Sequence, residues 1–150
     1  MLKYLKYLWY IILLGFFVAV IIYYNKSSDI ATNQSVQYLR NNVEFEGYVT
    51  GFEQSNNHAF GVIHLKLTKS NTKEFNKVIK GGIYPYRIKG DIAELYCTVS
   101  VDRKKGDIVK LISEEQIVYY NPQNSKEEGS IFIITDPYNI NFVKEHTVFK

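Results

Sequence analysis

The chain has 150 residues, of which 46% are hydrophobic and 22% charged, so we expect one folded domain rather than a disordered chain. The formal net charge is +3, but Lys3 and Lys6 precede the most apolar segment, and the residues after them include 16 basic and 15 acidic side chains. A nucleic-acid-binding domain normally has a clear excess of basic side chains, so no nucleic-acid partner is expected.

The first predicted element is a membrane-spanning helix over residues 7–24. These 18 residues contain no charged side chain, and as a helix they would be about 27 Å long, close to the ~30 Å hydrocarbon core of a bilayer. Aromatic residues lie at both ends, as they do at membrane interfaces: Tyr7, Trp9, Tyr10, Tyr23 and Tyr24. Because Lys3 and Lys6 precede the segment, the positive-inside rule predicts a cytoplasmic N-terminus and an extracytoplasmic remainder, periplasmic or extracellular.

A cleaved signal peptide is the alternative, since it would also have a basic start and an apolar middle. The apolar stretch is long for such a peptide, and residues 23–26 are bulky and polar instead of a small-residue cleavage site, although Ser27 and Ser28 could serve a tolerant peptidase. We therefore divide the chain into an N-terminal transmembrane anchor (1–24), a polar stalk (25–42) that is a short helix or flexible, and an extracytoplasmic β domain (43–150).

From residue 43 onward, apolar and polar residues alternate with a period of two, which predicts strands. The predicted strands are 43–50, 61–68, 83–89, 92–101, 107–112, 116–120 and 130–135, with a weaker alternation over 140–150 that could close the sheet. Gly106 lies in the short connection between two of them, which predicts a hairpin of 92–101 with 107–112.

One helix is predicted in this domain, over Asn71–Gly82. Asn71 and Glu74 have the spacing of a capping box, and an apolar face followed by Gly81 and Gly82 completes the signal. About seven or eight short strands with one short helix predict a mainly β fold, and we expect a small OB-like or related β-barrel.

Catalytic and metal-binding patterns are missing from the sequence. His58 and His64 would lie about 20 Å apart along an extended strand, and no zinc spacing, G-x-S-x-G or phosphate-binding loop is present. We therefore expect no catalytic residue, no metal and no cofactor. Cys97, the one cysteine, falls at an apolar position of strand 92–101, and we expect a small, buried and unreactive side chain.

Tyrosine is the most suggestive residue type, since eight of the 13 tyrosines follow the anchor. An exposed aromatic face could stack on a glycan or a peptide, and its candidate residues are Tyr84, Tyr86, Arg87, Tyr96, Tyr119 and Tyr120. The alternative is that these tyrosines cover half-buried strands, where tyrosine is favoured.

Four short motifs carry a resemblance to a known group of proteins: residues 57–61 (NHAFG), 84–87 (YPYR), 93–97 (AELYC) and 105–109 (KGDIV). In these motifs, residues 43–120 resemble small, uncharacterised, membrane-anchored envelope proteins of Bacteroidota-type bacteria. The resemblance implies an N-terminal anchor and a compact β domain. It implies no activity for any residue.

These features predict a single-pass membrane protein whose β domain is a non-enzymatic binding or assembly module of the cell envelope. Its expected partners are the lipid bilayer, through residues 7–24, and an envelope protein or glycan. One alternative is an enzyme acting on an envelope polymer, which would need a cleft where His58 or His64 meets a carboxylate. The other is an oligonucleotide-binding OB-like domain.

Overall fold

The computed structural model describes the backbone of residues 2–149, and the side chains of these residues except 2–8, 11, 25 and 27–34. The chain divides into two compact units, Met1–Ser35 and Val36–Lys150. Helix α1 (Leu2–Leu39) forms the first unit and continues into the second. Lys3, Lys6 and Tyr7, on which part of the membrane prediction depends, lie outside the residues whose side chains are described. Among the residues that the structure describes, no helix is long and apolar enough to cross a membrane.

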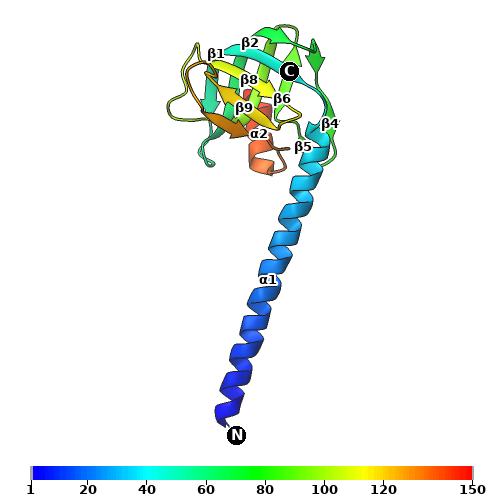
Figure 1. Ribbon diagram of the computed structural model, residues 1–150, viewed down its shortest axis with the longest axis vertical. Coiled ribbons are helices and arrows are strands. Elements are labelled where there is room, and N and C mark those ends of the chain that lie inside the picture. Colours follow the sequence, from blue (N-terminus) through cyan, green and yellow to red (C-terminus); the bar gives the residue numbers. More distant parts are fainter. Residues whose placement is uncertain (1, 150) are drawn as a thin grey trace. The chain divides into compact units, whose positions relative to one another are not determined.

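The second unit is built on one antiparallel sheet of eight strands in the order β10-β9-β8-β1-β2-β7-β6-β3, so the prediction of a mainly β fold is confirmed (Figure 1). The strands are β1 (Glu44–Gln54), β2 (Phe60–Ser70), β3 (Glu74–Phe75), β6 (Tyr86–Lys89), β7 (Ile92–Thr98), β8 (Ile108–Ile112), β9 (Ile117–Tyr120) and β10 (Glu128–Ser130). Two further short strands, β4 (Val78–Ile79) and β5 (Gly82–Ile83), pair with each other.

The sheet has two free edges. Within residues 2–149, β10 pairs only with β9 and β3 pairs only with β6, so no strand pair closes the expected barrel. A single bridge between Ile83 and Ile134 ties the segment after β10 to β5. Because the sheet is open, the end of β7 has no neighbouring strand on one side in the described part of the chain.

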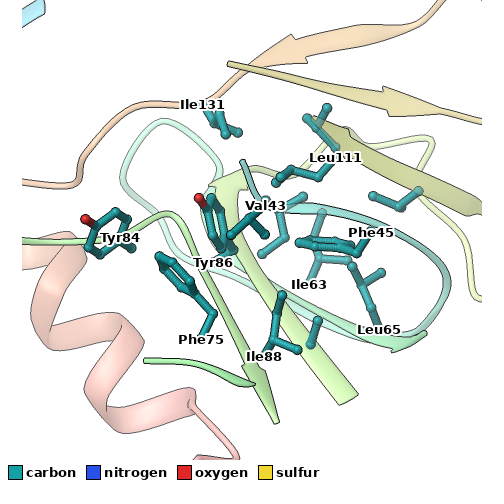
Figure 2. Close-up of a cluster of buried hydrophobic side chains, with 14 of the residues drawn as sticks. Val43, Phe45, Ile63, Leu65, Phe75, Tyr84, Tyr86, Ile88, Leu111 and Ile131 are labelled. Carbon is teal, nitrogen blue, oxygen red and sulfur yellow. The ribbon is translucent and has the colours of Figure 1, made fainter. Parts of the chain in front are cut away.

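Two cores lie on opposite faces of β2 and β7, because successive side chains of a strand point to opposite faces. Ile63 and Leu65 of β2 belong to the larger core, together with Phe45 and Tyr86 (Figure 2). The other face carries a second core, formed with helix α2 (Pro137–His146) by Phe60, Val62, Tyr96, Ile134 and Val143, with Ile83, Ile140 and Phe142 packed against them.

The packing of the second unit begins before residue 43, where we expected the β domain to start. Leu39, the last residue of α1, is fully buried in the larger core. The side chain of Asn41 accepts a hydrogen bond of 2.9 Å from the Tyr86 hydroxyl. The segment expected as a stalk is therefore helical to Leu39, and its last residues belong to the β domain.

The helix predicted over Asn71–Gly82 is wrong, since this segment contains β3, β4 and β5. Asn71 does not cap a helix; its side chain accepts from the Glu44 amide and donates to the Asn42 carbonyl. The Phe75 ring lies 4.9 Å from the rings of Tyr84 and Tyr86. A helical signal this short is weak by itself, and these tertiary contacts outweigh it.

The helix of this domain is instead α2, where we expected a weak strand over 140–150. Asp136 is its N-cap and accepts from the Asn139 amide at 2.9 Å, and Pro137 occupies the first turn. Both residues are typical of a helix start. The predicted strand 130–135 stops directly before Asp136 and Pro137, because an Asp-Pro pair also ends strands, and the helix start was missed for that reason.

The predicted hairpin of 92–101 with 107–112 is also wrong. β7 pairs with β2 and β6, whereas β8 pairs with β1 and β9. The connection between them is held to β1, because the Gly106 amide donates to the Val49 carbonyl and the Val49 amide donates to the Asp107 carbonyl. The strand ends at Thr98 rather than at the predicted residue 101, and Val101 is 91% exposed.

The close approach of β1 and β2 at Gly61 gives a first test. A Cβ atom at Gly61 would lie 2.1 Å from the Glu53 carbonyl oxygen, whereas one at Gly51 would meet nothing nearer than a His64 ring atom at 3.8 Å. We expect Gly61→Ala to lower the free energy of unfolding by about 1–3 kcal/mol. The control Gly51→Ala should change it by less than about 0.5 kcal/mol. Urea unfolding followed by circular dichroism measures both, and equal effects would contradict the packing described here.

Candidate functional site

The first candidate site is centred on Glu94, a carboxylate with no exposed surface. Glu94 lies on β7, on the same face of the sheet as the second core. Its Oε2 accepts hydrogen bonds of 2.6 Å from the Tyr96 hydroxyl and 2.6 Å from the Thr147 hydroxyl. Its Oε1 accepts one of 2.7 Å from the Val148 amide. Buried polar groups need such partners, and both oxygens of Glu94 have them.

His64 of β2 lies directly opposite Glu94 in the antiparallel register. Its Nδ1 is 3.3 Å from Glu94 Oε1. This buried nitrogen forms no hydrogen bond with any described residue. On the other side of the ring, Nε2 is 4.0 Å from Glu53 Oε1. The imidazole therefore lies between a buried and a half-exposed carboxylate.

Glu53 connects His64 to helix α2. Its Oε2 is 3.6 Å from His146 Nε2, and His146 Nδ1 is 2.8 Å from the Phe142 carbonyl oxygen. Because a carbonyl oxygen only accepts, Nδ1 carries the proton and donates. The imidazole also stacks on the Phe142 ring, with 4.0 Å between ring centroids. We call Glu94, His64, Glu53 and His146 the carboxylate–histidine cluster; it links β7, β2, β1 and α2.

Hydrogen bonding decides the charge of Glu94. Burial raises the pKa of the carboxyl, but the hydrogen bonds from Thr147, Tyr96 and the Val148 amide, together with the nearby His64 side chain, lower it by more, so the pKa lies below its usual value. The same contact acts in the opposite direction on Tyr96, whose pKa is raised by burial and by the neighbouring carboxylate. Glu94 is therefore an anion near pH 7, and Tyr96 is a neutral donor.

The arrangement suits anchoring of the chain better than reaction chemistry. Thr147 and Val148 donate to Glu94, and Arg87 of β6 donates to the Phe149 carbonyl at 3.1 Å and lies over its ring. Segment 147–149 is thus held against β6 and β7.

His58 does not belong to the cluster; it is exposed in the turn between β1 and β2, with a φ of 49°. Within the part of the chain described, no group of three or more His, Cys, Asp or Glu side chains is arranged to hold a metal ion.

The tyrosines that we selected do not form an exposed face, which corrects that prediction. Tyr84 and Tyr86 are buried in the larger core (Figure 2), and Tyr120 belongs to the same core. Tyr96 is buried in the second core. The half-buried Arg87 contacts Phe149, and the Tyr119 hydroxyl donates to Glu115 at 2.7 Å. The tyrosines therefore cover the sheet, which was the alternative stated from their strand positions.

The second candidate site is a groove beside the free end of β7. Two cavities of about 320 and 350 Å³ lie there, and both are lined by Cys97, Thr98, Ser130 and Phe132. We call this hollow the seam groove; residues 96–98 line one side and residues 127–136 the other. Cavities of this size fall within the range of ligand-binding sites in proteins.

The thiol and the two tyrosine hydroxyls that line the seam groove are unreactive near pH 7. Burial raises the pKa of the Cys97 thiol to about 11, and its Sγ is 3.4 Å from the Tyr120 hydroxyl. Burial also raises the pKa of Tyr120, and the Tyr96 hydroxyl is already donated to Glu94. Cys97 is half-buried and protonated near pH 7, so it matches the expected unreactive thiol.

Comparison of the chain with protein-family models, with curated proteins and with solved structures finds no significant match.

Sequence reasoning missed most of the carboxylate–histidine cluster. Its members are far apart in the sequence, and the pairing of β2 with β7 and the position of α2 bring them together. One signal was present: Glu94 is the only charged residue between Ile92 and Val101 in a strand of apolar and small side chains. A charged residue in a strand buried on both faces needs specific partners.

Removing the charge of Glu94 should loosen segment 147–149. We expect Glu94→Gln to lower the free energy of unfolding by about 2–3 kcal/mol, because hydrogen bonds to a charged acceptor are replaced by weaker ones. Hydrogen exchange of the Val148 amide should become faster. A matched control is Glu115→Gln, which removes an exposed carboxylate that also accepts from a tyrosine; it should have little effect on either measurement. Unchanged exchange at Val148 would refute the anchoring role.

The lowered pKa of Glu94 also predicts a pH dependence. As the pH falls, the unfolded chain binds a proton at this position before the folded chain does, so the contribution of the charge is complete above about pH 4.5 and is lost below it. The stability difference between the native protein and Glu94→Gln should therefore shrink as the pH is lowered from about 4.5. Urea unfolding at a series of acidic pH values measures this difference, and a difference independent of pH would contradict the assignment.

Proposed function

We propose that this protein is a single-pass, membrane-anchored binding or assembly module of the cell envelope, and that its ligand occupies the seam groove. In this proposal residues 7–24 span the bilayer and the β domain lies on the extracytoplasmic side. The uncharged segment between aromatic ends, with Lys3 and Lys6 before it, supports the anchor and its orientation.

The seam groove is the observation that carries the binding role. Its walls combine apolar side chains, such as Ile131 and Phe132, with a few polar ones, such as Thr98 and Ser130. This mixture is typical of ligand sites, where apolar contact provides affinity and polar groups fix orientation. Thr98, Ser130 and Phe132 are exposed, so a ligand can reach them.

The chemistry of the groove supports binding rather than catalysis. Its thiol and its two tyrosine hydroxyls are neutral near pH 7 for the reasons given above. Arg103 in the groove is already paired with Asp107 and Glu127, at 3.2 and 2.6 Å. His64, the histidine that does meet carboxylates, lines neither cavity of the groove.

The membrane placement is tested by the accessibility of the β domain. An epitope tag is added after Lys150, and protease is given to intact cells whose outer layer has been made permeable. We expect the tag to be removed while a cytoplasmic marker protein stays intact. Protection of the tag under conditions that digest a known extracytoplasmic protein would place the β domain in the cytoplasm and overturn the envelope proposal.

A further inference from the structure

We propose that the occupant of the seam groove is an extended segment of another protein, carrying basic side chains, that adds to the sheet as a strand. This inference rests on the proposed binding function and names the class of partner. It follows from the main-chain groups on the two walls of the groove and from the charges at its ends.

The first wall is the end of β7. The Tyr96 amide donates to the Pro85 carbonyl, whereas the Val99 amide donates to the Ala59 carbonyl on the opposite side. Because neighbouring residues of a strand direct their main-chain groups to opposite sides, Thr98 points the same way as Tyr96. β6 begins only at Tyr86, so no strand of the described chain pairs with Thr98 on that side.

The second wall is β10 and the residues after it. The Tyr120 amide donates to the Glu127 carbonyl, and the Ile131 amide donates to the Gln116 carbonyl, so odd-numbered residues of this segment face β9. By the same alternation, Ser130 and Phe132 direct their main-chain groups away from β9. Neither of these two amides has a hydrogen-bond partner within residues 2–149.

The two free edges face one hollow. Thr98, Ser130 and Phe132 line both cavities of the seam groove, so their unpaired amides and carbonyls are available to one extended chain lying between the walls. A strand edge with unpaired main-chain groups is a template for another strand. Addition of a peptide strand uses these groups for affinity and the side-chain contacts along the groove for specificity.

Charge indicates which peptide fits. Arg103 is neutralised by its two carboxylate partners, whereas Glu128 and Asp136 are exposed and form no ion pair with a described basic side chain. Each cavity of the groove is therefore lined by a carboxylate without an ion-pair partner among the described residues, Asp136 in one and Glu128 in the other, and lysine or arginine in the incoming segment would complement this charge.

The same charge disfavours a second copy of this chain as the occupant. If β10 paired with β10 of another copy, a two-fold related contact would bring equivalent acidic residues, Glu128 among them, near each other. Like charges across a strand pair are destabilising. A basic segment of a different protein avoids this repulsion.

The test uses the full chain in lipid nanodiscs and a phage-displayed library of random linear peptides, with empty nanodiscs for counter-selection. We expect enrichment of peptides that alternate apolar residues and contain lysine or arginine. The best peptide is then synthesised with N-methyl groups on alternate amides. Methylation of one set of amides should weaken binding at least about tenfold, and methylation of the other set much less, because only one set faces a given edge.

Two charge-reversal variants provide the matched control. Glu128→Lys, at the groove, should weaken binding of the selected peptide about tenfold, whereas Glu74→Lys, on the opposite edge strand β3, should leave it within about twofold. Circular dichroism confirms that both variants are folded. Phe132→Ala, which removes an exposed ring from the groove wall, should also weaken binding.

Three results would overturn strand addition: no enrichment over empty nanodiscs, equal binding after N-methylation of either set of amides, or equal binding by the two charge-reversal variants. Self-association of the chain that Phe132→Ala abolishes, together with no enriched peptide, would assign the groove to a second copy. None of these results depends on the side of the membrane on which the domain lies, so they are distinguishable from failure of the protease experiment. A glycan that binds the groove when no peptide does would leave the proposed binding function standing and reject this inference.

Discussion

The buried charge of Glu94 is the constraint on which one face of the sheet depends, namely the face of β2 and β7 that helix α2 covers. An ionised carboxylate without solvent is costly unless hydrogen-bond donors surround it. Here the donors come from β7 itself and from segment 147–149, with His64 alongside. Helix α2 precedes that segment directly, so satisfying Glu94 also determines where α2 ends and which face of β2 and β7 it covers.

This covering divides the sheet into protected and open parts. Helix α2 and the second core cover one face of β2 and β7, and the larger core covers the opposite face. What remains uncovered is the seam, where β7 extends beyond β6 and β10 has no outer neighbour. A closed barrel would have no such edge, so the departure from the expected barrel and the candidate binding groove are one structural feature.

The predictable part of the fold was the part with long, regular alternation. β1 and β2 are long strands whose inward residues are read directly from the sequence, whereas β3, β4 and β5 are two residues each and depend on contacts with distant rings such as Tyr84 and Tyr86. Helix α2 was missed although Asp136 and Pro137 mark its start, because the same pair also ends strands.

The candidate sites were less accessible to sequence reasoning than the fold. Tyrosine on a strand is equally consistent with an exposed face and a buried one, and packing in the two cores buries Tyr84, Tyr86, Tyr96 and Tyr120. The seam groove depends on main-chain groups at Thr98, Ser130 and Phe132, which have no sequence signature. An unpaired amide is a property of neighbours in space, and no local pattern encodes it.

The bonds between Glu94 and residues 147 and 148 join positions that are more than 50 residues apart, since their sequence separations are 53 and 54. During synthesis, β2 and β7 are complete long before Thr147 and Val148 are added, so until then Glu94 lacks these two hydrogen-bond donors. The face of β2 and β7 that α2 covers therefore reaches its final structure only after Val148 has left the ribosome. A product truncated before Thr147 would retain the sheet and α2, but Glu94 would keep only the Tyr96 hydroxyl among its three hydrogen-bond donors, and the buried charge would destabilise this face of the sheet.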